Sequence, residues 1–471
     1  MPQILLALAQ AAFMGVPIVV LLSQLPFKRF AFVQTILGAS IGIGVSSCVY
    51  FLWLVLAGAS SAKVFLVDGL LILGLLYFYW IRRRIAPNSR PVARDTGAGK
   101  VQWLMPLCTG LCFFAGCIIC ACFFAEEIRE YPHGNWDAWC TWNLRARFLF
   151  WGGEHWQQGL SPAIAWSHPQ YPLLIPGAIA RCWAALGGAS KYAPTAIAFW
   201  FTFGTVGLLT ATVAAVRGAT QGFLAGLFLL GAVGLTRNGA QQYADIPLSF
   251  FFLASLSCLY LHRYFEVTGG LILAGLCAGL AAWTKDEGSV FLMLLLVING
   301  VLCLCFASFK EARKETLHLI AGAALPLMCL FLFKSINPCP SGFHNDGLAA
   351  NVARILSWER HWVILGYMGD ALLDAGSWRD KSGLILLGAY VFVSGVKIPS
   401  LVYRVFATIL CVLIFQFIAY YAIYLITPLD LDWHISHSID RLFLHLFPGL
   451  ILVAFLAMGS PKVHGRPPSP S

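Results

Sequence analysis

Charged side chains are scarce in this sequence. Only 11% of its 471 residues are Asp, Glu, Lys or Arg, whereas 59% are hydrophobic. A chain with so few charges cannot cover a water-facing surface, which excludes a soluble globular protein. Apolar runs follow one another from Ile4 to Met458 instead, and about 20 apolar residues are enough for a helix to cross the hydrocarbon core of a bilayer. We therefore predict an all-α polytopic membrane protein.

Signatures of several other classes are also missing. The sequence has no Walker-type phosphate loop, no G-x-S-x-G nucleophile elbow and no internal repeat. Most of its fifteen cysteines lie inside apolar runs, and none forms a C-x-x-C pair in a polar loop, so we expect neither a disulfide framework nor a cysteine metal site. The net charge of +10 comes from short basic clusters between apolar runs, a pattern that indicates membrane orientation rather than nucleic-acid binding.

Three basic clusters predict the orientation of the chain. They are Lys28 and Arg29, then Arg82, Arg83, Arg84, Arg90, Arg94 and Lys100, and finally Lys310, Arg313 and Lys314. The positive-inside rule places all three in the cytoplasm. The polar stretches 126–171 and 335–381 then lie outside. The first apolar run has no basic n-region and no A-x-A cleavage site, so we expect it to remain as a membrane helix.

About 13 transmembrane helices are expected, with juxtamembrane helices in the first large external loop. The predicted spans are 4–24, 31–57, 64–81, 103–125, 194–216, 222–235, 247–261, 270–283, 289–307, 317–333, 382–396, 405–426 and 442–458. The apolar segment 172–186 contains Arg181, and counting it as a crossing would move the Lys310 cluster outside. We favour a juxtamembrane or re-entrant helix there, with a full crossing as the alternative.

The spans and loops suggest five parts. They are a three-helix membrane segment, 1–100; a central membrane module, 101–334, with the external loop 126–171; an external lid-like loop, 335–381; C-terminal membrane helices, 382–458; and a Pro- and Ser-rich cytoplasmic tail, 459–471, expected to be disordered.

The polar stretch GNWDAWCTWNLRARFLF contains Asp137 between Trp136 and Trp139. Partial desolvation by the indole rings would raise the proton affinity of this carboxylate, which suits a general base. A helix N-cap or an ion pair with Arg145 or Arg147 is the alternative.

Three later clusters carry polar groups at the ends of apolar runs. His168, in HPQYP, is either a donor to an anion or an exposed residue at a helix start. Asp245, in YADIP, is either a helix N-cap or a carboxylate that orders the first external loop or holds an acceptor hydroxyl. Lys285 precedes Asp286 and Glu287 in TKDEG, which is either a solvated turn or a phosphate clamp.

Arg441 opens the last predicted span, and His445 lies one turn later on the same helical face. A guanidinium binds phosphate bidentately, although snorkelling to lipid headgroups is the alternative. Acids, bases and cations thus gather on one side of the membrane. This distribution predicts an enzyme that acts on a phosphate-bearing lipid.

The order of these motifs resembles the GT-C superfamily of integral-membrane glycosyltransferases, especially its protein-mannosyltransferase-like and ArnT/RgtA-like groups. The matching segments are WDAWCTWNLRA for the acidic external loop, HPQYPLLIP for the K/R/H-P-P-x-x-x-P entry, YADIPLSFFF for the D-P-L turn, GLCAGLAAWTKDEG for the G-L-A-x-G-L-A-x-L-T-K turn and DRLFLHLFP for the terminal R-Y-x-x-x-x-x-P. The resemblance covers residues 121–448 in outline. It departs from the family in having three spans, rather than one, before the helix that leads to the acidic loop.

The resemblance implies an inverting transfer of a sugar from a polyprenyl-phosphate donor to a glycan, lipid or protein acceptor. It places the site on the external face of a bacterial inner membrane. Asp137 would be the base, and the implied substrate-binding residues are Arg145, His168, Asp245, Lys285, Glu287, Arg441 and His445. No metal ligand is assigned, but many members pair two acids in this loop, so a divalent ion stays open. A lipid-linked-sugar flippase, a polysaccharide ligase or polymerase, and a non-catalytic scaffold are the alternatives.

Overall fold

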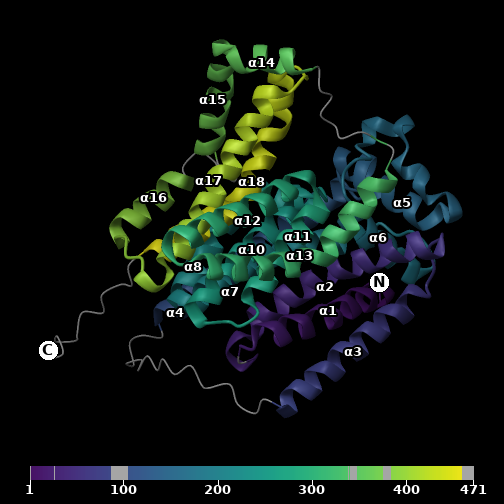
Figure 1. Ribbon diagram of the computed structural model, residues 1–471, viewed down its shortest axis with the longest axis horizontal. Coiled ribbons are helices and arrows are strands. Elements are labelled where there is room, and N and C mark those ends of the chain that lie inside the picture. The colour runs from purple at the N-terminus through teal and green to yellow at the C-terminus, as the bar shows by residue number, and fades with distance from the viewer. Residues whose placement is uncertain are drawn as a thin grey trace, which may run out of the picture.

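The computed structural model describes residues 2–25, 27–85, 104–337, 339, 347–374 and 383–458, and this part of the chain is helical apart from turns and one isolated β-bridge. The helices form an elongated bundle from which α17 and α18 project beneath α14 and α15 (Figure 1). This confirms the all-α fold. The predicted tail, the residues Arg90, Arg94 and Lys100, and the side chains of Lys28, Arg29, Arg82, Arg83 and Arg84 lie outside the described residues.

The described residues contain eighteen α-helices. They are α1 (Pro2–Ser23), α2 (Phe27–Ala57), α3 (Val64–Ile85), α4 (Leu104–Glu130), α5 (Asn143–Trp151), α6 (Leu174–Leu186), α7 (Tyr192–Arg217), α8 (Ala219–Leu230), α9 (Val233–Ala240), α10 (Asp245–Phe265), α11 (Gly270–Thr284), α12 (Asp286–Phe306), α13 (Phe309–Ile336), α14 (Leu348–Leu356), α15 (Trp358–Leu373), α16 (Gly383–Ser394), α17 (Tyr403–Ile426) and α18 (Leu431–Ala457).

Ten helices in the described residues are long and apolar enough to span a membrane, or eleven if α8 and α9, which meet at 63°, form one broken span. The sequence predicted about 13. Two predicted spans are short helices instead, because α11 has 15 residues and α16 has 12. At 1.5 Å per residue they measure about 22 and 18 Å, less than the hydrocarbon core. The apolar composition of these two segments predicted membrane spans, but composition alone does not determine where a helix begins and ends.

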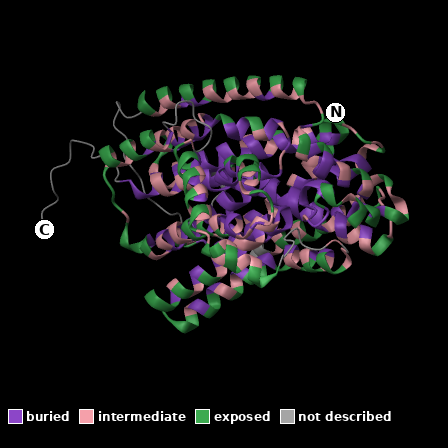
Figure 2. Ribbon diagram, turned by 90° about the horizontal axis from the view of Figure 1, so that it is seen from above, coloured by how far each residue is buried: buried purple, intermediate pink, exposed green. Residues whose placement is uncertain are grey.

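Burial separates an inner set of helices from a lipid-facing rim. In the most apolar window of α10, 94% of the residues are buried, against 11% for α3. Figure 2 shows buried residues in the middle of the molecule and exposed ones around it. The exposed side chains of α3 include Leu66, Leu70 and Leu73. An apolar rim of this kind fits a multi-pass protein surrounded by lipid.

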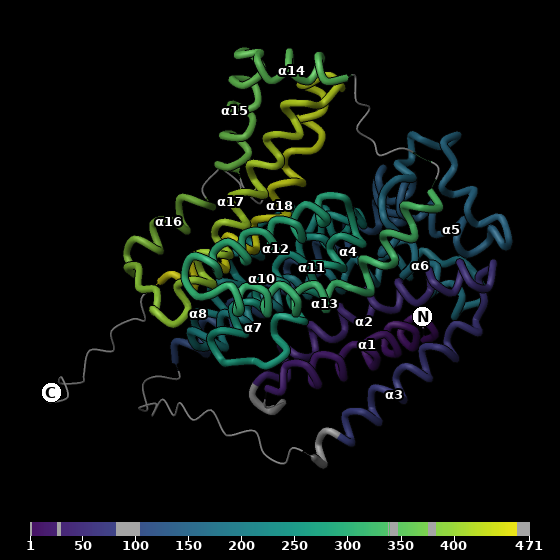
Figure 3. Tube along the Cα trace, in the orientation of Figure 1, coloured from purple at the N-terminus to yellow at the C-terminus, as the bar shows by residue number. Residues whose placement is uncertain are grey.

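Helix α6 occupies most of the apolar segment 172–186, for which the sequence left open whether it crosses the membrane. It has 13 residues, about 20 Å in length, and nearly all of them are buried. Figure 3 shows it beside α2 and α5. The guanidinium of Arg181 donates 2.9 and 2.6 Å hydrogen bonds to Asp68 of α3 and a 2.9 Å bond to the carbonyl of Ala7. The arginine is therefore paired inside the protein rather than exposed to lipid, and both interpretations of the segment, a juxtamembrane or re-entrant helix and a full crossing, stay predictions.

Helices occupy two polar segments that lie between the predicted spans, 335–381 and 430–441. Helices α14 and α15 occupy much of 335–381, and α15 packs against α17 and α18. Helix α18 begins at Leu431, not at 442, because Asp430 caps its first turn by accepting a hydrogen bond from Trp433 N. Ile435 and Ile439 are buried on this added part of the helix. Arg441 therefore lies ten residues inside α18 rather than at its start.

Candidate functional site

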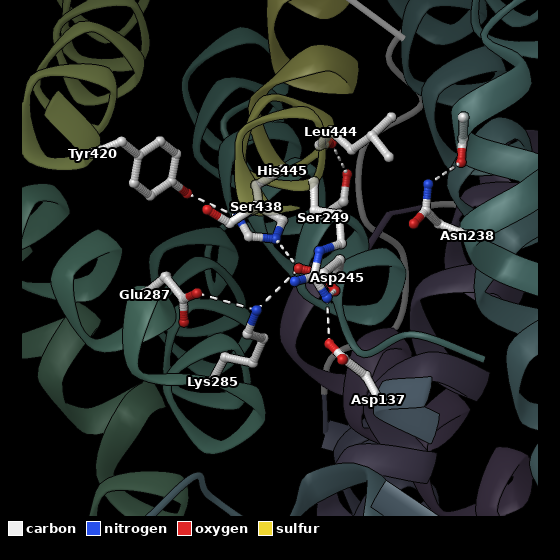
Figure 4. Close-up of polar contacts among 12 residues, drawn as sticks. Asp137, Asn238, Asp245, Ser249, Lys285, Glu287, Tyr420, Ser438, Leu444 and His445 are labelled. Atoms are coloured by element: carbon white, nitrogen blue, oxygen red, sulfur yellow. Dashed lines mark hydrogen bonds and ion pairs between the residues drawn. The ribbon is translucent and has the colours of Figure 1, made fainter. Parts of the chain in front are cut away.

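The first residue of α10, the turn between α11 and α12, and the middle of α18 meet at one place (Figure 4). They contribute Asp245, Lys285 and the pair Arg441 and His445, respectively. Lys285 has an extended backbone, with φ −151° and ψ 160°, so the chain breaks between the two helices at this residue. The break lets the ammonium group turn inward to Asp245, so this segment is not a solvated turn.

Asp245 is the centre of the cluster. Its side chain is 2% exposed, and Oδ1 accepts hydrogen bonds from Lys285 Nζ at 2.9 Å and from His445 Nε2 at 2.8 Å. Arg441 Nη1 lies 4.0 Å from Oδ2. The N-cap interpretation is wrong, because the cap position is Ala244 and Asp245 makes no side-chain cap bond. The carboxylate instead compensates cationic groups that would be costly to bury alone.

Two further residues extend this core. Lys285 Nζ also contacts Glu287 Oε1 at 3.1 Å, so the ammonium lies between two carboxylates. On the other side, His445 Nδ1 lies 2.9 Å from the hydroxyl of Tyr420 on α17. In the tautomer that donates Nε2–H to Asp245, Nδ1 is the acceptor for the Tyr420 hydroxyl. Tyr420 is fully buried, so this branch stabilises the orientation of the imidazole.

Asp137 joins the cluster from the first large polar loop. It directly precedes a π-helical turn, Ala138–Trp142, and its side chain is 31% exposed. Its carboxylate forms an ion pair with Arg441, rather than with Arg145 or Arg147. Arg441 also donates a 3.1 Å bond to the carbonyl of His437. Single π-helical turns are frequent at functional sites. The structure thus places the predicted base against a predicted phosphate ligand.

Arg145, on α5, is a buried cation without a carboxylate partner among the described residues. Its side chain donates to the carbonyls of Thr141, at 3.3 Å, and of Tyr171, while Nη2 has no hydrogen-bond partner in the described residues. The guanidinium lies 5.0 Å from the ring centroid of Trp142. Burial lowers the pKa of Arg145 to about 9. An anion at Nη2 would relieve this cost.

His168 faces the same charged groups from the segment before α6. It has a left-handed backbone, with φ 52°, and its ring lies 5.4 Å from that of Tyr171. Burial lowers the pKa of His168 below its ordinary value of 6.5; the charges of Arg145, Lys285 and Arg441 lower it further, while Asp137 raises it. A neutral imidazole near these cations can donate one hydrogen bond without adding charge.

The structure brings together all eight residues that the sequence singled out, in two groups. Asp137, Asp245, Lys285, Glu287, Arg441 and His445 are linked by direct polar contacts, and Arg145 and His168 adjoin them through Tyr171. Three further residues of the site, Tyr171, Tyr243 and Tyr420, were not predicted from the sequence. The ring of Tyr243 lies 5.2 Å from the Arg441 guanidinium, and Lys285 Nζ is 5.7 Å from the Tyr171 ring. Tyr171 lies in the polar motif HPQYP and Tyr243 lies in YADIP, so the sequence could have pointed to both. Tyr420 lies inside an apolar run, where no local pattern distinguishes it.

One group in the described residues has the spacing of metal ligands, and it lies elsewhere. Cys303, Glu311 and Glu315 meet where α12 leads into α13, at the opposite end of α12 from Glu287. Arg404 already binds both Glu315 oxygens, at 2.6 and 3.0 Å. The group is therefore better described as an ion-paired anchor for α17, and the Asp245 cluster has no assigned metal.

Known proteins provide no template for this site. A scan against protein-family models and searches of curated proteins and of solved structures found no match to the chain. Function is therefore inferred from the residues of the site, since a helical membrane fold alone does not define an activity.

The two acids should differ in their effect on stability. Asp245→Asn leaves Lys285 and His445 without their buried carboxylate, and we expect it to lower the free energy of unfolding by about 3–5 kcal/mol. Asp137→Asn breaks a partly exposed pair and should cost about 1 kcal/mol or less. Denaturant unfolding of both variants in detergent micelles measures the difference. Equal losses would show that Asp245 is not the centre of the cluster.

His168 should make stability depend on pH. Its pKa in the folded chain is below 6.5, so on acidification the unfolded chain takes up this proton first, and the free energy of unfolding falls as the pH drops through about 6.5. The variant His168→Gln lacks this contribution. Thermal unfolding between about pH 7.5 and 5.5 should therefore show a steeper loss for the natural protein. Parallel curves would contradict the burial of a neutral His168.

Proposed function

We propose that this chain is a GT-C-type membrane glycosyltransferase that transfers a sugar from a polyprenyl-phosphate donor to an acceptor hydroxyl. One observation carries the proposal: the partly exposed carboxylate of Asp137 lies directly against the Arg441 guanidinium, beside a buried cluster of further charges. A general base next to an anion-binding cation is the pairing needed for attack on an anomeric carbon whose leaving group is a phosphate.

The charges of the cluster suit a lipid phosphate. Three cations, Arg145, Lys285 and Arg441, are matched by three carboxylates, Asp137, Asp245 and Glu287. A polyprenyl-phosphate sugar carries a single negative charge, whereas a nucleotide diphosphate sugar carries more. Arg441 and the free Nη2 of Arg145 are the natural phosphate donors, with His168 adding a neutral donor.

The reaction is a single displacement. Asp137 accepts the proton of the acceptor hydroxyl while that oxygen forms a bond to the anomeric carbon. The bond between this carbon and the phosphate oxygen breaks, and its electron pair leaves with the polyprenyl phosphate. Arg441 and Arg145 stabilise the charge that develops on the phosphate. The configuration at the anomeric carbon is inverted, because the acceptor attacks opposite the leaving group.

The ion pair between Asp137 and Arg441 also suggests an order of binding. In the protein alone, the base is held by the cation that is proposed to bind the donor. A phosphate that binds Arg441 competes with the carboxylate and frees it to accept a proton. The donor would therefore bind first, which keeps the base inactive until a leaving group is in place. Lys285 stays paired with Asp245 and Glu287 and supplies positive potential to the same place.

The proposal includes a membrane setting and partners. The donor would come from the bilayer that surrounds the apolar helices, and the acceptor would be a glycan, lipid or protein on the far side from the basic clusters. For a bacterial chain this side is the periplasmic face of the inner membrane. A flippase would need ionisable groups near the bilayer midplane; here the cluster lies at the N-terminal ends of α10 and α12, which favours the enzyme.

Transfer of sugar in reconstituted liposomes tests the proposal. Purified protein is supplied with polyprenyl-phosphate hexoses that carry a radiolabel in the sugar, and label in acceptor or water is measured. We expect Asp137→Asn to lower the rate by about 100-fold or more, because general-base catalysis is lost. The matched control is Glu154→Gln, an exposed acid of the same loop, which should transfer at the natural rate.

Other outcomes would contradict specific parts of the proposal. Equal rates for Asp137→Asn and the natural protein would remove Asp137 as the base. Intact labelled donor that appears in the opposite leaflet, with no sugar released from any donor, would show a flippase instead of a transferase.

A further inference from the structure

Helix α14 exposes only apolar side chains. Its exposed residues fall on one continuous face of the helix, and none of them is charged or can form a side-chain hydrogen bond. They are Leu348, Ala349, Val352, Ala353, Ile355 and Leu356. Leu348 and Leu356 are the most open, at 81% and 76% exposure. A helix at a water-facing surface has the opposite pattern, with its apolar side turned toward the protein.

Two arginines of this region point inward and fix the orientation, while Glu359 and Asp370 of α15 are exposed. Arg354 of α14 donates to Asn351 Oδ1 at 3.1 Å and to the carbonyl of Ile426 at 3.5 Å. Arg360 of α15 donates 2.9 Å bonds to the carbonyls of Tyr424, Leu425 and Thr427. These carbonyls belong to the C-terminal end of α17, which has no helical donors for them. The two arginines therefore fasten the α14–α15 hairpin over α17, with the apolar face outward.

The apolar face continues onto neighbouring helices. On α15 it follows Trp358, Trp362, Leu365 and Leu372, whose spacing keeps them on one side of the helix. On α17, a candidate membrane span, the exposed side chains include Ile414, Phe415 and Ile418. Figure 1 shows α14 and α15 directly beside the projecting ends of α17 and α18. The surface of α14 is thus an extension of a membrane-spanning surface.

The exposed side of α18 in the same region is different. Asp432, Ser436, His437 and Asp440 are exposed there beside one aromatic residue, Trp433, which stacks on His437, and all of them precede Arg441 on the helix. The projecting part of the molecule therefore has one apolar side and one mostly polar side. This contrast indicates two different surroundings, lipid for α14 and water for the start of α18.

We propose that α14 and the start of α15 lie in the membrane leaflet at the Asp137 end of the molecule, with the apolar face of α14 against lipid chains. Trp358 and Trp362 fit the level of the headgroups, where indole rings are favoured. The segment is then a lipid-held wall beside the polar cluster rather than a lid in water. This inference does not depend on the proposed reaction.

Spin-label accessibility tests the inference. A nitroxide is attached through a genetically encoded keto amino acid at Leu348, Val352 or Leu356, which leaves the fifteen native cysteines unchanged. The full-length protein is reconstituted in vesicles of phosphatidylethanolamine and phosphatidylglycerol. Collision with oxygen, which concentrates in lipid, is compared with collision with a water-soluble nickel chelate. The control position is Ser436 on the polar side of α18.

At the three α14 positions, we expect the ratio of oxygen to nickel collisions to exceed the ratio at Ser436 several-fold. Nickel collisions that dominate at α14 would place the helix in water and overturn the inference. Low collision rates with both reagents would also overturn it, because they would show that protein, such as a second copy of the chain, covers the face. Because no substrate is present, failure here is distinct from failure of the transfer assay.

Discussion

The buried carboxylate of Asp245 is the interaction on which the cluster depends. It binds Lys285 from the turn before α12 and His445 from α18, and it lies 4.0 Å from Arg441. Through these groups it reaches Glu287, Tyr420 and Asp137. One acid therefore connects the start of α10, the turn between α11 and α12 and the middle of α18 to the first polar loop, and its loss would leave cationic groups buried with less compensation.

The same arrangement explains how a hydrophobic chain can hold a polar site. The cations are positioned by tertiary contacts and already balanced by carboxylates, so the protein folds without a ligand. Arg441 shares its guanidinium between Asp137 and Asp245, and Arg145 keeps one nitrogen unpaired. In the proposed reaction, an incoming phosphate would use both without breaking the Lys285–Asp245 pair. Preorganised donors of this kind lose little energy to reorganisation during a reaction.

The sequence predicted the class of fold and the residues of the site better than it predicted their contacts. Apolar runs identify membrane helices directly, and each site residue stands out as a polar group between such runs. The partner of Asp137 and the start of α18 depend on packing and capping across distant segments. Sequence order therefore suggested Arg145 or Arg147 for Asp137, an N-cap for Asp245, and thirteen spans. Tyr420 carries no local signal at all, and the catalytic roles stay predictions.

The most direct test of the account is an electron cryomicroscopy structure of the protein in lipid nanodiscs with polyprenyl phosphate, the proposed leaving group. The account predicts that the phosphate lies within hydrogen-bond distance of the Arg441 guanidinium and that the Asp137 carboxylate has moved away from it. A phosphate bound at another place, with the Asp137–Arg441 pair intact, would contradict the account.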